Sequence, residues 1–267
     1  MLSIYLRRTE DYFMWTRSEL KNNAKKALKG TFLISVLVII LYSILTGGEN
    51  SNLTLKLGED ATKELELRNE MLSYTIGENY FDNLISYPLT TFFLLFGALA
   101  SFLSFLYQIF VAAPLSIGLS RYFIVNRRAP EENTPLNLFD TFRSGHYLNG
   151  VGVIFLQNLF IFLHFLLLII PGIIKTFKLY MVPYIMADHP EMNYKDAFSL
   201  STEMTQGQKM NIFILELSFI GWYLLATLTL GLAAPLVTTY RKATVTELYE
   251  VLKSPEERTE VAPPGYF

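Results

Sequence analysis

Residues 162–185 read FLHFLLLIIPGIIKTFKLYMVPYI, a run that is almost entirely apolar. The run is longer than a soluble core uses in one stretch, and this length predicts membrane-embedded helix. A proline and a glycine interrupt the run at positions 171 and 172, and two lysines follow within it. Proline suits the first turn of a helix and pushes the residue before it out of helical geometry, so we expect a tight helical hairpin with its tip at Ile170–Gly172.

The composition of the whole chain agrees with a membrane protein. Of its 267 residues, 51% are hydrophobic and 17% are charged, whereas about 25% of the residues in a soluble domain are charged. The formal net charge of −2 supplies no basic field that would favour nucleic acid as a partner. The chain has no cysteine, and it lacks P-loop, dinucleotide-binding, zinc-protease and serine-hydrolase motifs. We therefore expect no cofactor, no bound metal and no enzymatic activity.

Hydrophobicity along the chain predicts an all-α fold, a polytopic transmembrane helical bundle of about six crossings with amphipathic helices at the membrane surface. The crossings are expected at residues 31–45, 89–112, 149–170, 171–187, 210–230 and 232–250. The second of these belongs to a longer apolar run, which we expect Pro114 to break. If residues 171–187 do not cross, the count falls to five and the C-terminus moves outside.

Charge distribution predicts the orientation of this bundle. Seven Lys and Arg residues precede the first crossing, whereas the segment 47–87 holds eight acidic residues against three basic ones. Because Lys and Arg are enriched on the cytoplasmic side, both termini are expected inside a bacterial cytoplasmic membrane. The expected organisation is a basic amphipathic cytoplasmic segment (1–30), a transmembrane bundle (31–250) with an extracellular acidic loop (47–87), and a disordered cytoplasmic tail (251–267).

A stripe of basic residues marks the N-terminal segment. Arg17, Lys21, Lys25 and Lys29 recur every four residues and therefore share one face of a helix. Such a stripe is typical of a positive-inside anchor, and it also favours contact with anionic lipid headgroups. The lipid bilayer is therefore the first expected partner, together with a membrane-protein partner or a second copy of the chain.

Several stretches resemble one bacterial family, the integral membrane proteins catalogued as domain of unknown function 975. The resemblance is carried by LKNNAKKALKG (20–30), SIGLSRYF (116–123), LLLIIPGIIK (166–175), YIMADHPE (184–191) and LELSFIGWYLLATLTLG (215–231). These stretches are spread over most of the chain. The resemblance implies a membrane location and a helical fold, and it implies no particular activity.

Four ionisable residues fall inside the predicted crossings: His164, Lys175, Lys178 and Glu216. Charges at such depth cost roughly 2.5–3.5 kcal/mol each, so these groups either hold the bundle together or reach out to water, as we favour, or line a polar cavity for a substrate, an ion or a lipid headgroup. With Pro171 at one edge of a core of about 30 Å, Lys178 lies about 10 Å and Glu216 about 21 Å from that edge. A direct pair between these two residues would need tilted helices.

A second group, Asp188, His189 and Glu191, follows the fourth predicted crossing. It predicts either a metal site or, as we favour, a solvated loop before the next helix. Taken together, the sequence favours a non-enzymatic scaffold, accessory subunit, or envelope-stress or immunity factor. The alternative is a small permease or lipid-handling protein with a polar intramembrane cavity, and interrupted helices such as the one at Pro171 are mildly favourable to it.

Overall fold

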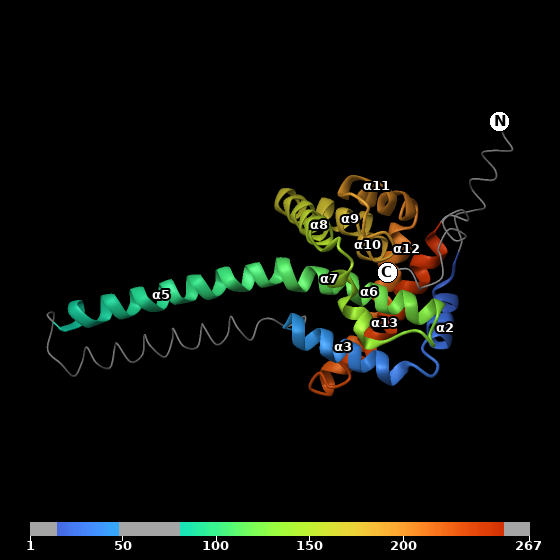
Figure 1. Cartoon of the computed structure of the whole chain (residues 1–267), viewed down its shortest axis with the longest axis horizontal. Helices are drawn as coiled ribbons and strands as arrows, with labels where there is room; N and C mark the ends of the chain where they lie inside the picture. Colours follow the sequence, from blue (N-terminus) through green and yellow to red (C-terminus); the bar gives the residue numbers. More distant parts are fainter. Residues whose placement is uncertain (1–14, 48–80, 254–267) are drawn as a thin grey trace. The chain divides into compact units, whose positions relative to one another are not determined.

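The computed structural model describes residues 15–47 and 81–253, and all regular elements in these ranges are helical, as predicted. In chain order (Figure 1) they are α2 (Arg17–Ala27), α3 (Phe32–Thr46), α5 (Phe81–Tyr107), the π-helical turn η2 (Gln108–Ala112), α6 (Ala113–Arg128), the 3-10 turn η3 (Pro135–Phe139), α7 (Asp140–Arg143), α8 (Tyr147–Leu167), α9 (Ile169–Lys178), α10 (Val182–Asp188), α11 (Tyr194–Met204), α12 (Lys209–Leu228) and α13 (Ala234–Leu252). Most of the predicted acidic loop 47–87 lies outside the described residues, but residues 81–87 belong to α5.

Four helical stretches are long and apolar enough to cross a membrane: Leu95–Arg128, Tyr147–Leu167, Ile169–Asp188 and Lys209–Leu228. A fifth is obtained if α2 and α3, which meet at a bend of 98°, count as one span. Helix α13, where the sixth crossing was predicted, is not among them. This helix carries Arg241, Lys242, Glu247 and Glu250, so the count of six crossings stays a prediction.

The chain divides into two compact units, one formed by residues 1–42 and 113–267 and the other by residues 43–112. In the smaller unit, α5 continues into η2, and the hydroxyl of Tyr107 donates a hydrogen bond to the carbonyl of Leu45. Apolar side chains of α5 such as Leu95 and Phe96 are more than 60% exposed, as suits a helix surrounded by lipid. Helicity continues past Pro114 instead of breaking, and the π turn η2 lies just before this proline, which has no N–H to donate.

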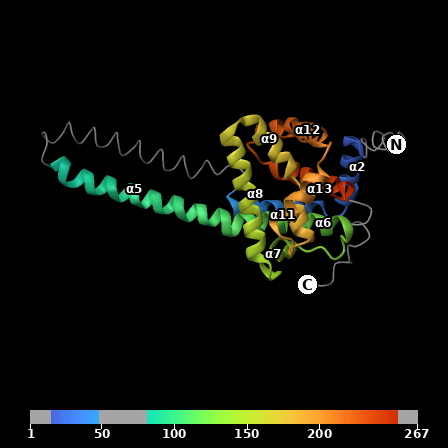
Figure 2. The ribbon, with the colours of Figure 1, turned by 90° about the horizontal axis from the view of Figure 1, so that it is seen from above.

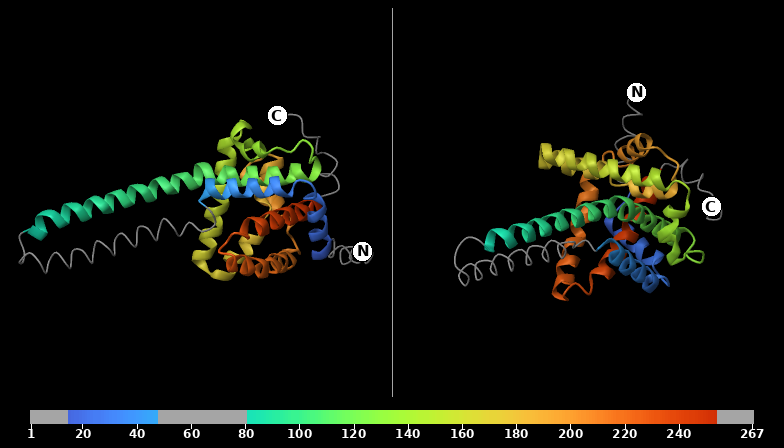
Figure 3. Two further views of the ribbon diagram at one scale, coloured as in Figure 1. Left: turned by 90° about the horizontal axis from the view of Figure 1, so that it is seen from below. Right: turned by 60° about the vertical axis from the view of Figure 1, so that its left-hand side comes forward.

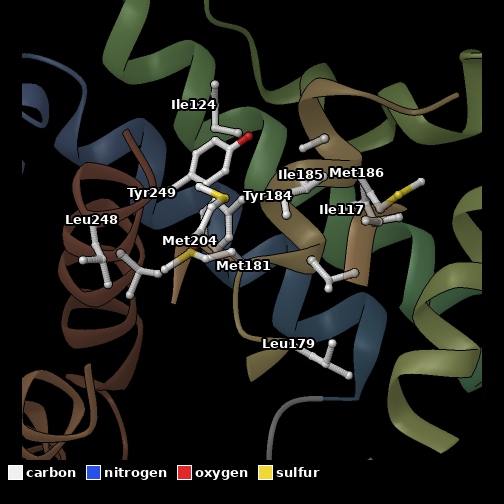
Figure 4. Packing of buried hydrophobic residues seen from close by; sticks show 14 of the residues in the cluster. Ile117, Ile124, Leu179, Met181, Tyr184, Ile185, Met186, Met204, Leu248 and Tyr249 are labelled. Carbon is white, nitrogen blue, oxygen red and sulfur yellow. The ribbon is translucent and has the colours of Figure 1, made fainter. Parts of the chain in front are cut away.

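The core of the larger unit forms where α6, α10 and α13 pack together. Figure 4 shows Tyr184 of α10 and Tyr249 of α13 packed among methionine and aliphatic side chains. The ring centroids of the two tyrosines are 5.5 Å apart. Helix α6 contributes a fully buried stretch from Tyr122 to Asn126. This stretch is apolar except for the polar groups of Tyr122 and Asn126, and each of these has a hydrogen-bond partner.

Two hydrogen bonds join the N-terminal helices α2 and α3, which are drawn in blue in Figure 3, to this core. The side-chain oxygens of Ser35 in α3 and Tyr122 in α6 lie 3.1 Å apart, and the amide of Asn126 donates to the carbonyl of Ala27 over 3.1 Å. The second bond satisfies a carbonyl in the last turn of α2, which intrahelical bonds leave open. Helix α2 packs against α13, so the first and last described helices of the larger unit lie side by side.

Helices α8 and α9 form the predicted hairpin (Figure 2), but its break lies earlier than expected. Leu168 has extended dihedrals of −162° and 149°, whereas Ile170 is already helical, so the prediction that Pro171 displaces Ile170 from the helix was wrong. Pro171 is the third residue of α9, within the first turn, where its missing N–H costs little. A Cβ atom on Gly172 would lie 2.4 Å from the ring of Phe165, which explains why the closest part of the hairpin carries glycine.

Candidate functional site

A groove of about 770 Å³ lies in the larger unit between α2, the start of α3, and the pair α12 and α13. We call it the α2 groove. It is lined by Ser18, Lys21, Asn22, Lys25, Leu28, Lys29, Gly30, Phe32, Trp222, Leu236, Val237 and Tyr240. The groove therefore has a polar wall supplied by α2 and an apolar wall supplied mainly by α12 and α13.

Local sequence explains why the lysines of α2 line the groove. The hydroxyl of Thr16 accepts a hydrogen bond from the N–H of Glu19 over 3.2 Å and so begins the helix. Leu20 and Ala24 are fully buried beneath α2, which fixes the rotation of the helix about its axis. Residues four apart share a face, and this places three members of the predicted basic stripe, Lys21, Lys25 and Lys29, along the groove. Arg17, the fourth member, does not line it.

Two of these lysines lie over aromatic rings. The ammonium nitrogen of Lys21 is 4.5 Å from the ring centroid of Phe219, and that of Lys25 is 5.9 Å from the ring of Tyr240. The two rings pack edge to face, with centroids 5.7 Å apart. Tyr240 also donates a hydrogen bond to the carbonyl of Lys21 over 3.4 Å. These contacts orient the lysines without neutralising them, because an aromatic ring carries no net charge.

The opposite wall of the groove is apolar and accessible. Trp222 is 53% exposed, Leu236 43% and Phe32 37%. Among the described residues that line the groove, none is acidic. The groove thus combines three ammonium groups with an open hydrophobic wall, an arrangement that suits an amphiphile with a negatively charged head.

Glu216, one of the four residues predicted inside the membrane, does not line this groove and pairs with residues that the sequence analysis did not single out. Its carboxylate accepts a hydrogen bond over 2.6 Å from the guanidinium of Arg241 on α13 and another from the hydroxyl of Tyr180. Among the described residues, no ion pair joins Glu216 to Lys175 or Lys178. The partner was missed because α13 was assigned as a crossing, and Arg241 was not considered with the intramembrane charges.

The other three predicted residues are not gathered around Glu216. His164 bonds within its own helix, with Nδ1 2.7 Å from the carbonyl oxygen of Phe160. The ammonium of Lys175 lies 5.5 Å from the ring centroid of Phe160. The backbone carbonyl of Lys178 accepts a hydrogen bond from the hydroxyl of Ser201 of α11 over 2.9 Å. The four residues therefore do not form one polar cavity in the described part of the chain.

A buried ionic cluster lies around Asp188, which we had placed in a solvated loop. Its side chain is 3% exposed, and its two carboxylate oxygens accept hydrogen bonds from Arg128 over 3.0 and 2.8 Å. Tyr249 donates to the same carboxylate over 3.0 Å, and Lys253 donates to it as well. The assignment of Asp188 to a solvated loop was therefore wrong.

This cluster links three helices. Arg128 ends α6, Asp188 ends α10, and Tyr249 lies in the last turns of α13. Arg128 also donates to Glu250 over 2.8 Å, while its neighbour Arg127 donates to Glu247 over 3.2 Å. These charges are buried because the ends of three helices that are distant in the sequence meet here. No local sequence pattern could therefore have predicted the cluster.

The metal site considered at positions 188–191 has no support among the described residues. His189 contacts Glu191 at 3.7 Å, but their side chains are 39% and 61% exposed, and the carboxylate of Asp188 is bonded within its own cluster. No group of three His, Asp or Glu side chains in residues 15–47 and 81–253 is arranged to hold a metal ion.

Comparison with known protein families assigns the chain to one of them. Residues 22–256, well over half of the chain, match the family described as protein of unknown function DUF975. The chain belongs to this family. The match includes Lys25, Lys29 and the α12–α13 wall of the α2 groove, and it includes the whole cluster around Asp188. Comparisons of this DUF975 protein with curated proteins and with solved structures gave no match.

Proposed function

We propose that this DUF975 protein is a multi-pass protein of the cytoplasmic membrane that binds an anionic phospholipid in the α2 groove and does not catalyse a reaction. The proposal includes about six crossings and both termini on the cytoplasmic side. The observation that carries it is the α2 groove itself, where three lysines face an apolar wall and no acidic side chain among the described lining residues opposes them.

Charge complementarity favours this occupant over others. A phosphodiester headgroup would accept hydrogen bonds from Lys21, Lys25 and Lys29, each of which offers up to three N–H donors. Its acyl chains would lie against Trp222 and Leu236, which are otherwise exposed. Of the functions that the sequence left open, the groove favours the lipid-handling protein over the scaffold, because a scaffold would not need unneutralised lysines beside an open apolar wall.

A lipid-binding measurement tests this proposal. The full chain would be purified in detergent and titrated with phosphatidylglycerol, and native mass spectrometry would count the bound lipids. We expect Lys21→Gln, Lys25→Gln and Lys29→Gln together to weaken binding at least tenfold, since each contributes a charge-assisted contact. Binding should also weaken with rising salt concentration.

A change of equal charge on the same helix provides the control. Arg17→Gln with Lys26→Gln removes two positive charges at positions that do not line the groove, and it is compared with Lys21→Gln with Lys25→Gln, which removes two from the groove. The first variant should bind phosphatidylglycerol like the unaltered chain, and the second should bind it more weakly. Equal losses in the two variants would mean that only the overall charge of α2 matters. Undiminished binding by the triple variant would refute the α2 groove as the site.

A further inference from the structure

A second groove, of about 620 Å³, lies in the larger unit between α8, α9 and α11. We call it the α11 groove. It is lined by Phe160, Lys175, Tyr194, Lys195, Phe198, Ser199, Thr202, Glu203 and Gln206. One broad face of α11 supplies most of these residues, and the candidate span Ile169–Asp188 supplies Lys175.

Aromatic rings and lysines form the base of this groove. Phe198 packs edge to face against both Phe160 and Tyr194, with centroid distances of 6.0 Å in each case. The ammonium of Lys175 lies 5.5 Å from the ring of Phe160, and that of Lys195 lies 6.0 Å from the ring of Tyr194. Within the described residues, neither ammonium group is paired with a carboxylate. A cation in a membrane-spanning segment is costly unless water or an opposite charge compensates it, and no described carboxylate supplies that charge to Lys175, so a bound anionic group at this open groove would stabilise it.

The charges of the two grooves differ in one respect. The α2 groove offers three lysines and no described acid, whereas the α11 groove offers two lysines together with the carboxylate of Glu203. Glu203 stands on the same face of α11 as Lys195, eight residues and about 12 Å further along the helix. A ligand that bound both ends would therefore carry a negative group at one end and a positive group at the other.

We propose that the α11 groove binds a phospholipid headgroup that carries both a phosphate and a primary ammonium, as phosphatidylethanolamine does. The phosphate lies between Lys175 and Lys195, and the ammonium donates to Glu203. The free hydroxyl of Ser199 and the amide of Gln206 line the path between these ends. A purely anionic headgroup would place its negative charge against Glu203 and bind less well.

The test measures which headgroup is preferred, in a background that removes the first groove. The full chain with Lys21→Gln, Lys25→Gln and Lys29→Gln would be mixed with equal amounts of phosphatidylethanolamine and phosphatidylglycerol of identical acyl chains. Native mass spectrometry then counts each bound lipid. We expect phosphatidylethanolamine to exceed phosphatidylglycerol about fivefold, which is the upper end for one solvent-exposed ion pair.

Two variants separate the roles of the charges. Glu203→Gln should bring the ratio close to one, and Lys175→Gln with Lys195→Gln should reduce the binding of both lipids. Since Lys195 and Glu203 are exposed, these changes should not unfold the chain. Glu132→Gln, an exposed change outside the groove, should leave the ratio unaltered.

Phosphatidylcholine and free phosphoethanolamine complete the test. The choline group has no N–H to donate to Glu203, so phosphatidylcholine should bind less than phosphatidylethanolamine. Free phosphoethanolamine should compete only weakly, because it lacks the acyl chains. The proposal is overturned if the parent shows no preference, if Glu203→Gln leaves the preference intact, or if free phosphoethanolamine competes as well as the lipid does.

Discussion

Replacing Asp188 by alanine should destabilise the larger unit by removing the acceptor that α6, α10 and α13 share. In the structure this carboxylate is 3% exposed and accepts hydrogen bonds from Arg128, Tyr249 and Lys253. Removing one partner of a buried ionic group typically costs 3–5 kcal/mol, since the opposite charge is left buried and unpaired. Here Arg128 keeps its 2.8 Å bond to Glu250. Most of the lost stability should therefore come from leaving the ammonium of Lys253 without a carboxylate, since its side chain is only 2% exposed.

Thermal unfolding in detergent, followed by tryptophan fluorescence, measures this cost. In a chain of this size each kcal/mol lowers Tm by about 2–4 °C, so Asp188→Ala should lower Tm by about 6–20 °C. Asp188→Asn keeps a carbonyl oxygen as acceptor and should lower Tm by less than Asp188→Ala does. Glu191→Ala removes the neighbouring carboxylate, which is 61% exposed and 3.7 Å from His189, and it should change Tm by no more than a few degrees.

A double variant tests the physical reason directly. Lys253→Met removes the cation that Asp188→Ala leaves unpaired, so the combined variant should be more stable than Asp188→Ala alone. If Asp188→Ala and Glu191→Ala had the same Tm, the cluster would contribute no more than a surface ion pair. If adding Lys253→Met lowered Tm further, the unpaired charge would not be the source of the loss.

Two further predictions concern the region where α6 meets η3 and α7. A Cβ atom on Gly118 would lie 1.9 Å from the carbonyl oxygen of Leu138, so Gly118→Ala should force the two backbones apart. The variant should lose about 1–3 kcal/mol or more of stability, measured by thermal unfolding. As a control, Gly152→Ala should be neutral or slightly stabilising, because a Cβ atom there would have no side-chain atom of the described residues within 4 Å. Burial raises the pKa of Asp140 above its ordinary value, against the nearby charge of Arg121, so the folded state holds this proton more tightly than the unfolded state does. Ionisation then costs stability as the pH rises from the ordinary pKa of 3.8 through the raised one. Asp140→Asn should therefore have a higher Tm than the unaltered chain at pH 7, and this difference should disappear below about pH 3, where the carboxyl is protonated in both states. A difference in Tm that did not depend on pH would contradict this reasoning.

The parts of the fold that depend on local pattern could be predicted from the sequence. The apolar run at 162–185 gave the α8–α9 hairpin, and the spacing of Lys21, Lys25 and Lys29 gave the polar wall of the α2 groove. Both follow from the 3.6-residue period of a helix and from the exclusion of charge from hydrocarbon. Neither depends on how distant helices pack.

The interactions that depend on packing between distant segments could not be predicted. From residue counts, a direct pair between Glu216 and Lys178 would need tilted helices, and the sequence pointed to no other partner; in the structure Glu216 pairs with Arg241, 25 residues further along the chain. Asp188 has an unremarkable local sequence, yet it is buried because Arg128, 60 residues earlier, and Tyr249, 61 residues later, close over it. Depth in the membrane can be estimated from residue counts, whereas the choice of partner requires the helix packing.

The α2 groove and the α11 groove are built in a similar way. Each has a short polar helix, α2 or α11, as one wall, and in each two lysines lie beside aromatic rings. In the α2 groove all three lysines come from the polar helix or the turn that follows it, whereas in the α11 groove Lys195 comes from α11 and Lys175 from a candidate span. On our proposals this set of charges selects the headgroup, because an apolar wall does not distinguish between lipids. Three lysines without an acid select net negative charge, and two lysines with Glu203 select a headgroup with both charges. Abolishing the preference by Glu203→Gln, without a change in the span, would therefore show that the carboxylate on α11 sets the selectivity of the α11 groove.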